Sequence, residues 1–280
     1  MSRSADLAAA LDWALSRVPD AGTPELVKDR PWSTVWRIPT PAGPVWLKAC
    51  PERTRHEVRL LAALARWGAP HNLEPLAVDE DLGTVLLPDG GPTLREAPGP
   101  SWADVLAGYA QTQRTTGAHV DELVALGVPD LRLPLLPAAF ERLARRWAPD
   151  VLPLLGRVTE EAAELAELGP APTIQHDDLH DGNVFARGGR VFDWGDACVA
   201  HPFTSLLVAW DGSPEPLAAY LARWPGVPRR AVDLGVRLGV VTRTDSWDRA
   251  LAGWPDPPEQ FRDAPAQWLR RLREAYDDDA

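Results

Sequence analysis

The second half of the chain contains the sequence Thr173-Ile174-Gln175-His176-Asp177-Asp178-Leu179-His180-Asp181-Gly182-Asn183-Val184-Phe185, followed shortly by Val191-Phe192-Asp193-Trp194-Gly195-Asp196. The short runs 184–186 and 190–192 flank Arg187-Gly188-Gly189, whose glycines suit a tight hairpin turn. Pairing of these two arms brings Asp178, Asn183 and Asp193 to the same end of a small ribbon. Mg²⁺ prefers oxygen ligands and usually keeps part of its coordination sphere for substrate phosphates. The sequence therefore predicts a site of phosphoryl transfer at this ribbon.

The spacing of these residues assigns a role to each of them. Kinase catalytic loops follow the pattern His-x-Asp-x-x-x-x-Asn, and a later Asp of an Asp-Phe-Gly segment holds the metal. Asp178 stands in that relation to both His176 and Asn183, whereas its neighbour Asp177 is out of phase. A polar loop rich in Asp and His is the alternative, but the joint pattern is more specific than a lone His-Asp pair. We expect Asp178 to be the catalytic base, and Asn183 and Asp193 to be the metal ligands.

The same residues carry a resemblance to a known family. The segment His176-x-Asp178-Leu179-His180-x-Gly182-Asn183, followed by Phe192-Asp193-Trp194, resembles the aminoglycoside phosphotransferase family, the small-molecule branch of the protein-kinase-like fold. The resemblance implies an enzyme that uses ATP and Mg²⁺ to phosphorylate a hydroxyl group of a small molecule. Asp177 is a departure, because relatives often carry Gly there.

The order of the expected elements agrees with this resemblance. We expect an α+β, bilobal protein-kinase-like fold, in which residues 1–88 form a small lobe with an antiparallel sheet and residues 89–280 form a larger, mostly helical lobe. Expected strands are residues 24–29, 34–38, 45–50, 73–78 and 84–87, after a helix at 5–18. Expected helices of the second lobe are 101–115, 136–148, 155–168, 203–210, 216–224, 231–241 and 258–276.

Composition limits the classes of protein that the chain can belong to. The 280 residues are 45% hydrophobic, which is enough for a sizeable core. No apolar run approaches the ~20 residues of a membrane span, and the N-terminus does not read as a signal peptide. Cys50 and Cys198 do not suggest a disulfide framework, so we expect a cytoplasmic protein that does not bind membranes.

The net charge of −11 argues against a nucleic-acid partner, because phosphate backbones attract basic surfaces. The charge is compatible with a cationic small-molecule substrate. Lys28 and Lys48 are the only lysines, and the scarcity makes a lysine within an apolar strand informative.

Lys48 lies in Val45-Trp46-Leu47-Lys48-Ala49-Cys50, which resembles the Val-Ala-Ile-Lys strand of kinases. The lysine of that strand contacts the α- and β-phosphates and pairs with an acid on the next helix. Glu52 and Glu57 are the candidates, and Glu57 is preferred because it lies one turn along a core-facing stripe. An edge-strand lysine with its head in water is the alternative interpretation of Lys48.

Two further segments are candidate nucleotide contacts. The link 29–34 falls where kinases place their nucleotide-covering loop, and it lacks the Gly-x-Gly-x-x-Gly pattern. The hydroxyls of Ser33 and Thr34 could donate to phosphates there, although an ordinary hairpin turn is as good an interpretation. In the connector between the lobes Pro88 has no N–H, so the donors to an adenine would be Asp89, Gly90 or Gly91.

The acceptor substrate is the least determined part. Asp196 is the candidate nearest the chemistry, and the more distant acids and aromatic residues have a structural role as the simpler interpretation. These residues are Asp211, Asp245, Asp248, Trp194, Trp210, Trp247 and Trp254. The leading functional hypothesis is a kinase for an aminoglycoside or other cationic antibiotic. The alternatives are a metabolic kinase for an amino sugar, amino alcohol or nucleoside-like compound, a protein kinase, and a nucleotide-binding pseudokinase without catalysis.

Overall fold

Apolar residues that alternate with polar ones in the first ninety positions form an antiparallel sheet. The computed structural model describes residues 3–278. Five strands pair in the order β1-β2-β3-β5-β4, and all neighbours are antiparallel. Their bounds are β1 (Glu25–Arg30), β2 (Ser33–Ile38), β3 (Val45–Ala49), β4 (Ala77–Asp79) and β5 (Thr84–Pro88).

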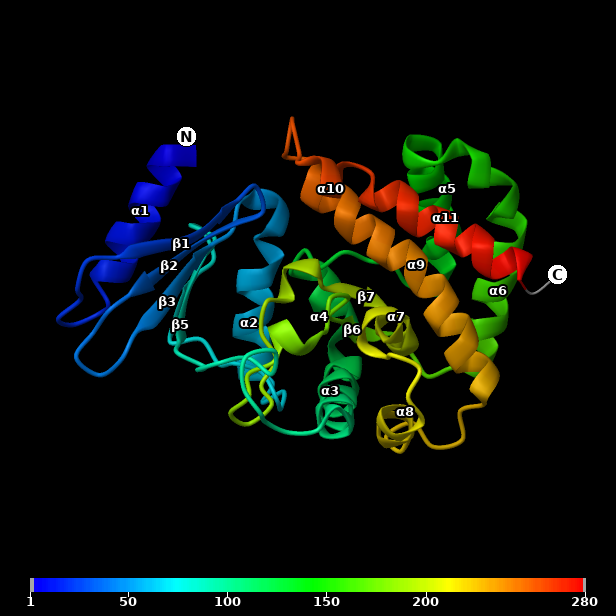
Figure 1. Cartoon of the computed structure of the whole chain (residues 1–280), viewed down its shortest axis with the longest axis horizontal. Coiled ribbons are helices and arrows are strands. Elements are labelled where there is room, and N and C mark those ends of the chain that lie inside the picture. The colour runs from blue at the N-terminus through cyan, green and yellow to red at the C-terminus, as the bar shows by residue number, and fades with distance from the viewer. Residues whose placement is uncertain (1–2, 279–280) are drawn as a thin grey trace.

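The two faces of this sheet have different partners, as Figure 1 shows for helices α1 (Arg3–Leu15) and α2 (His56–Arg66). Trp36, Leu47 and Leu86 form a small buried cluster with α1 on the outer face. Because side chains alternate along a strand, Lys48 points to the inner face, opposite Val35 and Val85 on the neighbouring strands. Helix α2 lies on the inner side and belongs to the main core. The inner face therefore borders the cleft.

A larger helical part follows the sheet, and Figure 1 shows it as the green-to-red half of the molecule. Its helices are α3 (Trp102–Thr116), α4 (Val120–Ala125), α5 (Leu136–Trp147), α6 (Leu155–Leu168), α7 (Leu206–Ala209), α8 (Pro214–Leu221), α9 (Arg229–Leu251), α10 (Glu259–Arg262) and α11 (Ala264–Asp277). A two-stranded ribbon of β6 (Thr173–Gln175) and β7 (Cys198–Ala200) lies among them. The fold class expected from the sequence, a small antiparallel sheet followed by a mostly helical part, is confirmed. Within residues 3–278, no helix is long and apolar enough to cross a membrane.

The predicted hairpin around Gly188 is present in a reduced form. Its arms share one antiparallel bridge, between Val184 and Val191, and Phe185 N–H donates to Arg190 O over 3.0 Å. Gly188 and Gly189 have φ values of 81° and 61°, which explains why glycine occupies both positions of the turn. The predicted strand 73–78 is wrong for most of its length, because β4 begins at Ala77.

Three predicted helix bounds of the second part are also wrong. The segment 203–210 begins with a 3₁₀ turn (Pro202–Ser205) before α7, and the segment 258–276 divides into α10 and α11 at Asp263. The helix expected at 231–241 continues to Leu251 as α9. Most residues between Val241 and Leu251 are polar although they are buried, so hydrophobic periodicity does not reveal this extension.

Leu47 provides a test of the small cluster between the sheet and α1. Leu47→Ala should lower the free energy of unfolding by about 2–5 kcal/mol, because it removes a fully buried side chain and leaves a cavity. Leu26→Ala is the matched control, since Leu26 lies in the same sheet but is 59% exposed, and its effect should stay within about 0.5 kcal/mol. Urea unfolding followed by circular dichroism measures both, and equal effects would contradict the described packing.

Candidate active site

The loop after β6 is held in place by the buried ring of His176. His176 Nδ1 accepts a hydrogen bond of 3.3 Å from Asp178 N–H, so Nε2 carries the proton that bonds Phe192 O over 2.9 Å. Burial lowers the pKa of His176 to about 4, so the ring is neutral at pH 7. His176 thus braces the loop through these two backbone contacts.

Asn183 lies at the end of this loop, beside Asp178. Its side-chain Nδ2 donates to the backbone carbonyl of Asp178 over 2.9 Å, and its own backbone carbonyl accepts from Phe192 N–H over 3.1 Å. The first bond orients the carboxamide so that Oδ1 faces away from the loop carbonyl. The second bond places Asn183 next to the segment that carries Asp193.

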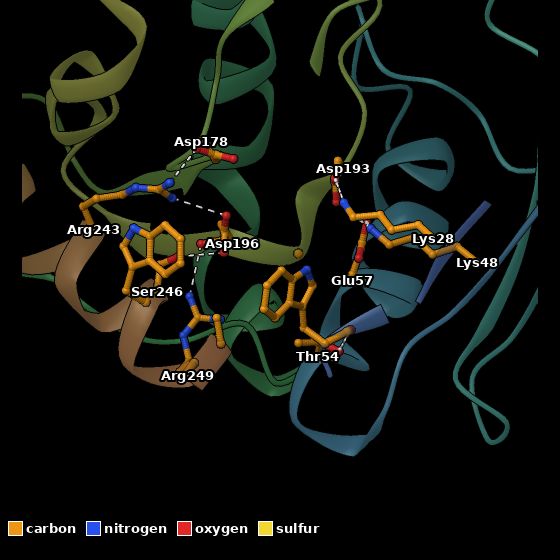
Figure 2. A pocket seen from close by; sticks show the side chains of 14 residues that line it. Lys28, Lys48, Thr54, Glu57, Asp178, Asp193, Asp196, Arg243, Ser246 and Arg249 are labelled. Atoms are coloured by element: carbon orange, nitrogen blue, oxygen red, sulfur yellow. Dashed lines mark hydrogen bonds and ion pairs between the residues drawn. The ribbon is translucent and has the colours of Figure 1, made fainter. Parts of the chain in front are cut away.

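Lys48 lies between two carboxylates, as Figure 2 shows. Its Nζ is 2.6 Å from Glu57 Oε1 and 2.6 Å from Asp193 Oδ1, and the ammonium is almost completely buried. Burial alone lowers the pKa of Lys48, but Asp193 and Glu57 outweigh it and the pKa is raised. Lys48 is therefore charged at neutral pH. Glu52 is exposed and does not contact it.

Asp193 connects the catalytic half of the site with both lysines of the chain. Its backbone adopts the left-handed conformation, with φ 63°. Asp193 Oδ2 lies 4.0 Å from Lys28 Nζ, while Oδ1 contacts Lys48. Burial raises the pKa of Asp193, but Lys48 and then Lys28 outweigh it and hold the pKa well below its usual range. The carboxylate is therefore ionised at neutral pH.

On the other side of the cleft Arg243 of α9 joins two carboxylates (Figure 2). Its Nη2 donates to Asp178 Oδ1 over 2.6 Å, and its Nη1 donates to Asp196 Oδ2 over 3.3 Å. Ser246 Oγ donates to Asp196 Oδ1 over 2.6 Å. Burial raises the pKa of Asp178 to about 7, with Arg243 opposing that effect. Burial also raises the pKa of Asp196, but Arg243 and Ser246 outweigh it and lower that pKa.

Arg243, Ser246 and Arg249 are site residues that the sequence analysis missed. All three lie on the part of α9 beyond Val241, where the helix was predicted to end. The available signal was their spacing, since positions 243, 246 and 249–250 recur on one helical face. Polar residues on the buried face of a helix are uncommon, so the polar sequence after Val241 did not indicate that the helix continues into a buried site.

These residues line one cavity between the sheet and the helical part. Its charged lining residues are four cations and four anions, namely Lys28, Lys48, Arg243, Arg249, Glu57, Asp178, Asp193 and Asp196. Trp32 and Trp247 add aromatic surface from the two sides. Trp32 also contacts Trp254 edge-on, with ring centroids 5.5 Å apart.

The structure does not bring every predicted nucleotide contact to this cavity. Thr34 pairs with Ala49 and so lies on the outer face of β2, where its hydroxyl donates to Asp29 over 2.9 Å. Ser33 is adjacent to Thr34 on this strand, so it faces the inner side, and it is buried. Neither hydroxyl belongs to the lining of the cavity, whose residues from this hairpin are Lys28 and Trp32.

The connector residues Asp89 and Gly90 are not among the residues that line this cavity. Asp89 is exposed, and its carboxylate accepts a 2.9 Å hydrogen bond from Trp46 Nε1. Gly90 packs against Phe185 so closely that a Cβ would lie 2.3 Å from the ring. Within residues 3–278, the amides of Asp89 and Gly90 form no backbone hydrogen bond, so both remain able to donate.

The more distant acceptor candidates are already engaged. Asp245 and Asp248 are buried and bonded to arginines, with Arg142 Nη2 2.5 Å from Asp245 Oδ1 and Nη1 3.1 Å from Asp248 Oδ2. Trp194 is fully buried in the core, and Trp210 bonds Ser213 O. Asp211 is exposed and accepts a bond from Ser213 N–H. Trp247 is the member of this set that lines the cavity.

The donor set fits a magnesium ion better than a transition metal. Among the described residues, no group of three His, Cys, Asp or Glu side chains could hold a metal. Asn183 and Asp193 offer a carboxamide oxygen and a carboxylate. Mg²⁺ is commonly bound by one or two protein oxygens together with water and phosphate oxygens, so this sparse set is sufficient.

Asp177, which is out of phase with the catalytic-loop pattern, is in an unfavourable environment in two ways. Its φ of 62° lies in the left-handed region, where a side chain is disfavoured. Its Oδ1 accepts a 2.7 Å bond from Thr242 Oγ1, while the buried Oδ2 has no partner. Burial raises the pKa of Asp177 to about 8. The carboxyl group is thus protonated in the folded protein at neutral pH.

Asp177→Asn should therefore change how stability depends on pH. In the wild type the folded protein binds the Asp177 proton more tightly than the unfolded chain does. The stability of the folded state is therefore highest below about pH 4 and falls as the pH rises towards about 8, because the unfolded chain loses this proton at a lower pH. The loss is at most about 1.4 kcal/mol per pH unit. The Asn variant does not titrate, so its stability relative to wild type should increase from pH 5 to pH 8. Urea unfolding at several pH values measures this, with exposed Asp181→Asn as control. Parallel curves would refute it.

Comparison with known proteins identifies the family of the chain. The phosphotransferase enzyme family matches residues 28–232, which include every residue named here from Lys28 to Asp196. Comparison with curated proteins gave no match.

Solved structures of small-molecule kinases share the fold. The macrolide 2′-phosphotransferase MphH from Brachybacterium faecium is 19% identical, with a TM-score of 0.54 over 91% of this chain and 99% of that one. A choline/ethanolamine kinase family protein from Mesorhizobium loti is 17% identical, with a TM-score of 0.63 over 95% and 94%. A streptomycin–ATP complex of APH(2″)-IIa is 16% identical, with a TM-score of 0.57 over 95% and 96%. The family match covers well over half of the 280 residues, and the chain therefore belongs to the phosphotransferase enzyme family.

Proposed function

We propose that this phosphotransferase transfers the γ-phosphoryl group of ATP to a hydroxyl group of a small molecule. The observation that carries the proposal is the convergence of Lys48, Asp193 and Asp178 on one cavity, because the strand that carries Lys48 is far in the chain from the two loops that carry the acids. The resemblance of the fold to a streptomycin–ATP complex supports ATP as the donor.

Each residue of the site has a role in this reaction. Lys48 binds the α- and β-phosphates and is oriented by Glu57. Asp178 accepts the proton of the acceptor hydroxyl or orients that hydroxyl, and Arg243 keeps its carboxylate in position. Asn183 and Asp193 would hold Mg²⁺, which neutralises charge on the transferred group when bound. The connector amides of Asp89 and Gly90 are the proposed contacts of the adenine.

The nucleotide-binding pseudokinase is the less favoured alternative. A site that had lost its chemistry would tolerate loss of the base or of its support. Here Asp178 keeps bonds from Arg243 and Asn183, and His176 fixes its backbone. The preorganisation of a base that nucleotide binding alone does not need favours an active enzyme.

The charge of the cavity bears on the acceptor. Asp196 is bonded to Arg243 and Ser246, and Asp245 is bonded to Arg142 and Arg249. Charged lining residues balance at four of each sign. A polycationic acceptor needs carboxylates that are not already neutralised, so we propose an acceptor with at most one positive charge. Amino alcohols and neutral hydroxyl compounds belong to this class, and the choline/ethanolamine kinase family protein shares the fold.

Asp178→Asn should lower turnover by about 10²–10⁴-fold, because it removes the proton acceptor while keeping the size of the side chain. ATP affinity should stay within about twofold, because Asp178 acts on the acceptor hydroxyl and is not one of the proposed nucleotide contacts. The control is Asp181→Asn, an exposed acid of the same loop that pairs with Arg95. Coupled ADP release and titration calorimetry measure the two quantities. Undiminished turnover would remove Asp178 from its role.

A panel of acceptors tests the charge argument. Neutral and singly charged hydroxyl compounds should give at least about tenfold higher kcat/KM than polycationic aminoglycosides, the ratio expected from one or more missing charged hydrogen bonds. Coupled ADP release across amino alcohols, sugars, nucleosides, macrolides and aminoglycosides provides the measurement. Preferred turnover of a polycation would contradict the charge argument while leaving the kinase reaction intact.

A further inference from the structure

Both lysines of the chain lie at Asp193, although the sequence analysis selected one of them. Lys48 Nζ contacts Asp193 Oδ1 at 2.6 Å, and Lys28 Nζ lies 4.0 Å from Asp193 Oδ2. Figure 2 shows the two side chains reaching the same carboxylate, and they come from β1 and β3, which lie on either side of β2. The chain has 27 arginines and two lysines, so the presence of both lysines at one acid is a specific arrangement.

A β-bulge turns Lys28 toward the cleft. Leu26 pairs with Trp36 and Lys28 pairs with Val35, so Val27 is an extra residue in β1. Trp36 packs in the outer cluster with α1, whereas Val35 is opposite Lys48 on the inner face. Without the bulge, Leu26 and Lys28 would share one face, because side chains alternate. The extra residue re-aims Lys28 to the inner face, a use that bulges often have beside active sites.

The turn that follows Lys28 is poorly suited to hold phosphates by its backbone. The link 29–34 contains no glycine, and Pro31 has no N–H. Arg53 donates to Pro31 O, and Thr54 Oγ1 donates to Trp32 O over 2.7 Å, so the two carbonyls of the turn are held by side chains of the next segment. Kinases use a flexible glycine-rich loop at this place. In this chain a side chain has to supply the charge that such a loop would supply by its amides.

A surface lysine that protects a sheet edge is the alternative explanation of Lys28. Edge strands often carry lysine for that reason, and β1 is an edge strand. Such a lysine points to solvent and has no preferred acid inside a cleft. Lys28 lines the cavity together with Lys48 and Asp178, and more than half of its side chain is covered. The contacts therefore favour a role in the site.

We propose that Lys28 is a second phosphate-binding ammonium, which contacts the terminal phosphates of a nucleoside triphosphate beside Lys48. The proposal rests on the proposed use of ATP and assigns to β1 the part that a glycine-rich loop has in other kinases. Lys48 is buried and held by Glu57, whereas Lys28 is half-covered and can follow the phosphates as they enter.

Nucleotide affinity tests this role independently of turnover. Titration calorimetry with ATP and with adenosine should be carried out on wild type, Lys28→Gln and Lys28→Arg in the full-length chain. Lys28→Gln should bind ATP about tenfold more weakly, the loss expected for one charged hydrogen bond, and should bind adenosine as wild type does. Lys28→Arg, which keeps the charge, should retain most of the ATP affinity.

The matched control is Arg37→Gln. Arg37 lies in the same sheet, and its loss removes one positive charge from an ion pair with exposed Glu25. This variant should bind ATP like wild type. Unchanged ATP affinity in Lys28→Gln, or equal losses for ATP and adenosine, would overturn the role of Lys28 while the kinase reaction stands. Absence of ATP binding by wild type would instead overturn the proposed function on which it rests.

Discussion

The ammonium of Lys48 between Glu57 and Asp193 is the interaction on which the rest of the structure depends. It joins β3, α2 and the loop after Phe192, which come from both parts of the molecule. A buried ion pair of this kind contributes little net stability, because desolvation offsets most of the attraction. Removal of one partner is costly, since it leaves an uncompensated buried charge. The arrangement is thus explained by the chemistry of phosphates better than by stability.

A second buried cation, Arg243, likewise lies between two carboxylates, at the side of the cavity proposed for the acceptor. It balances Asp178 and Asp196 and also donates to Asp177 O over 3.1 Å. The end of α9 is therefore polar on its buried face, which contradicts the usual amphipathic pattern of a helix. The two cations divide the cleft into a phosphate side and an acceptor side. Each carboxylate at the centre is held ionised or in place by one of them.

The predictable part of the site is the part whose spacing is local. Asp178 and Asn183 lie five residues apart in one loop, and Glu57 is one turn into the helix that follows the strand of Lys48. Arg243 is 65 residues from Asp178, and its contact depends on the packing of α9 against the loop, which no periodicity encodes. Lys28 was missed because an irregularity in strand pairing, the bulge at Val27, decides which face it occupies. Thr34 was assigned to the nucleotide for the same reason, since the face of a strand residue follows from register.

The restriction of lysine to Lys28 and Lys48 has a practical consequence for chemical modification. Apart from the terminal amine, every primary amine of the chain lies at the phosphate side of the cleft. Lys48 is shielded by burial, so of the two lysines Lys28 would be the one that amine-directed reagents acylate. Attachment of a dye or a solid support through a lysine would therefore block the cleft, and the thiols of Cys50 and Cys198 are buried. The same property makes the extent of acylation of Lys28 a readout of cleft occupancy.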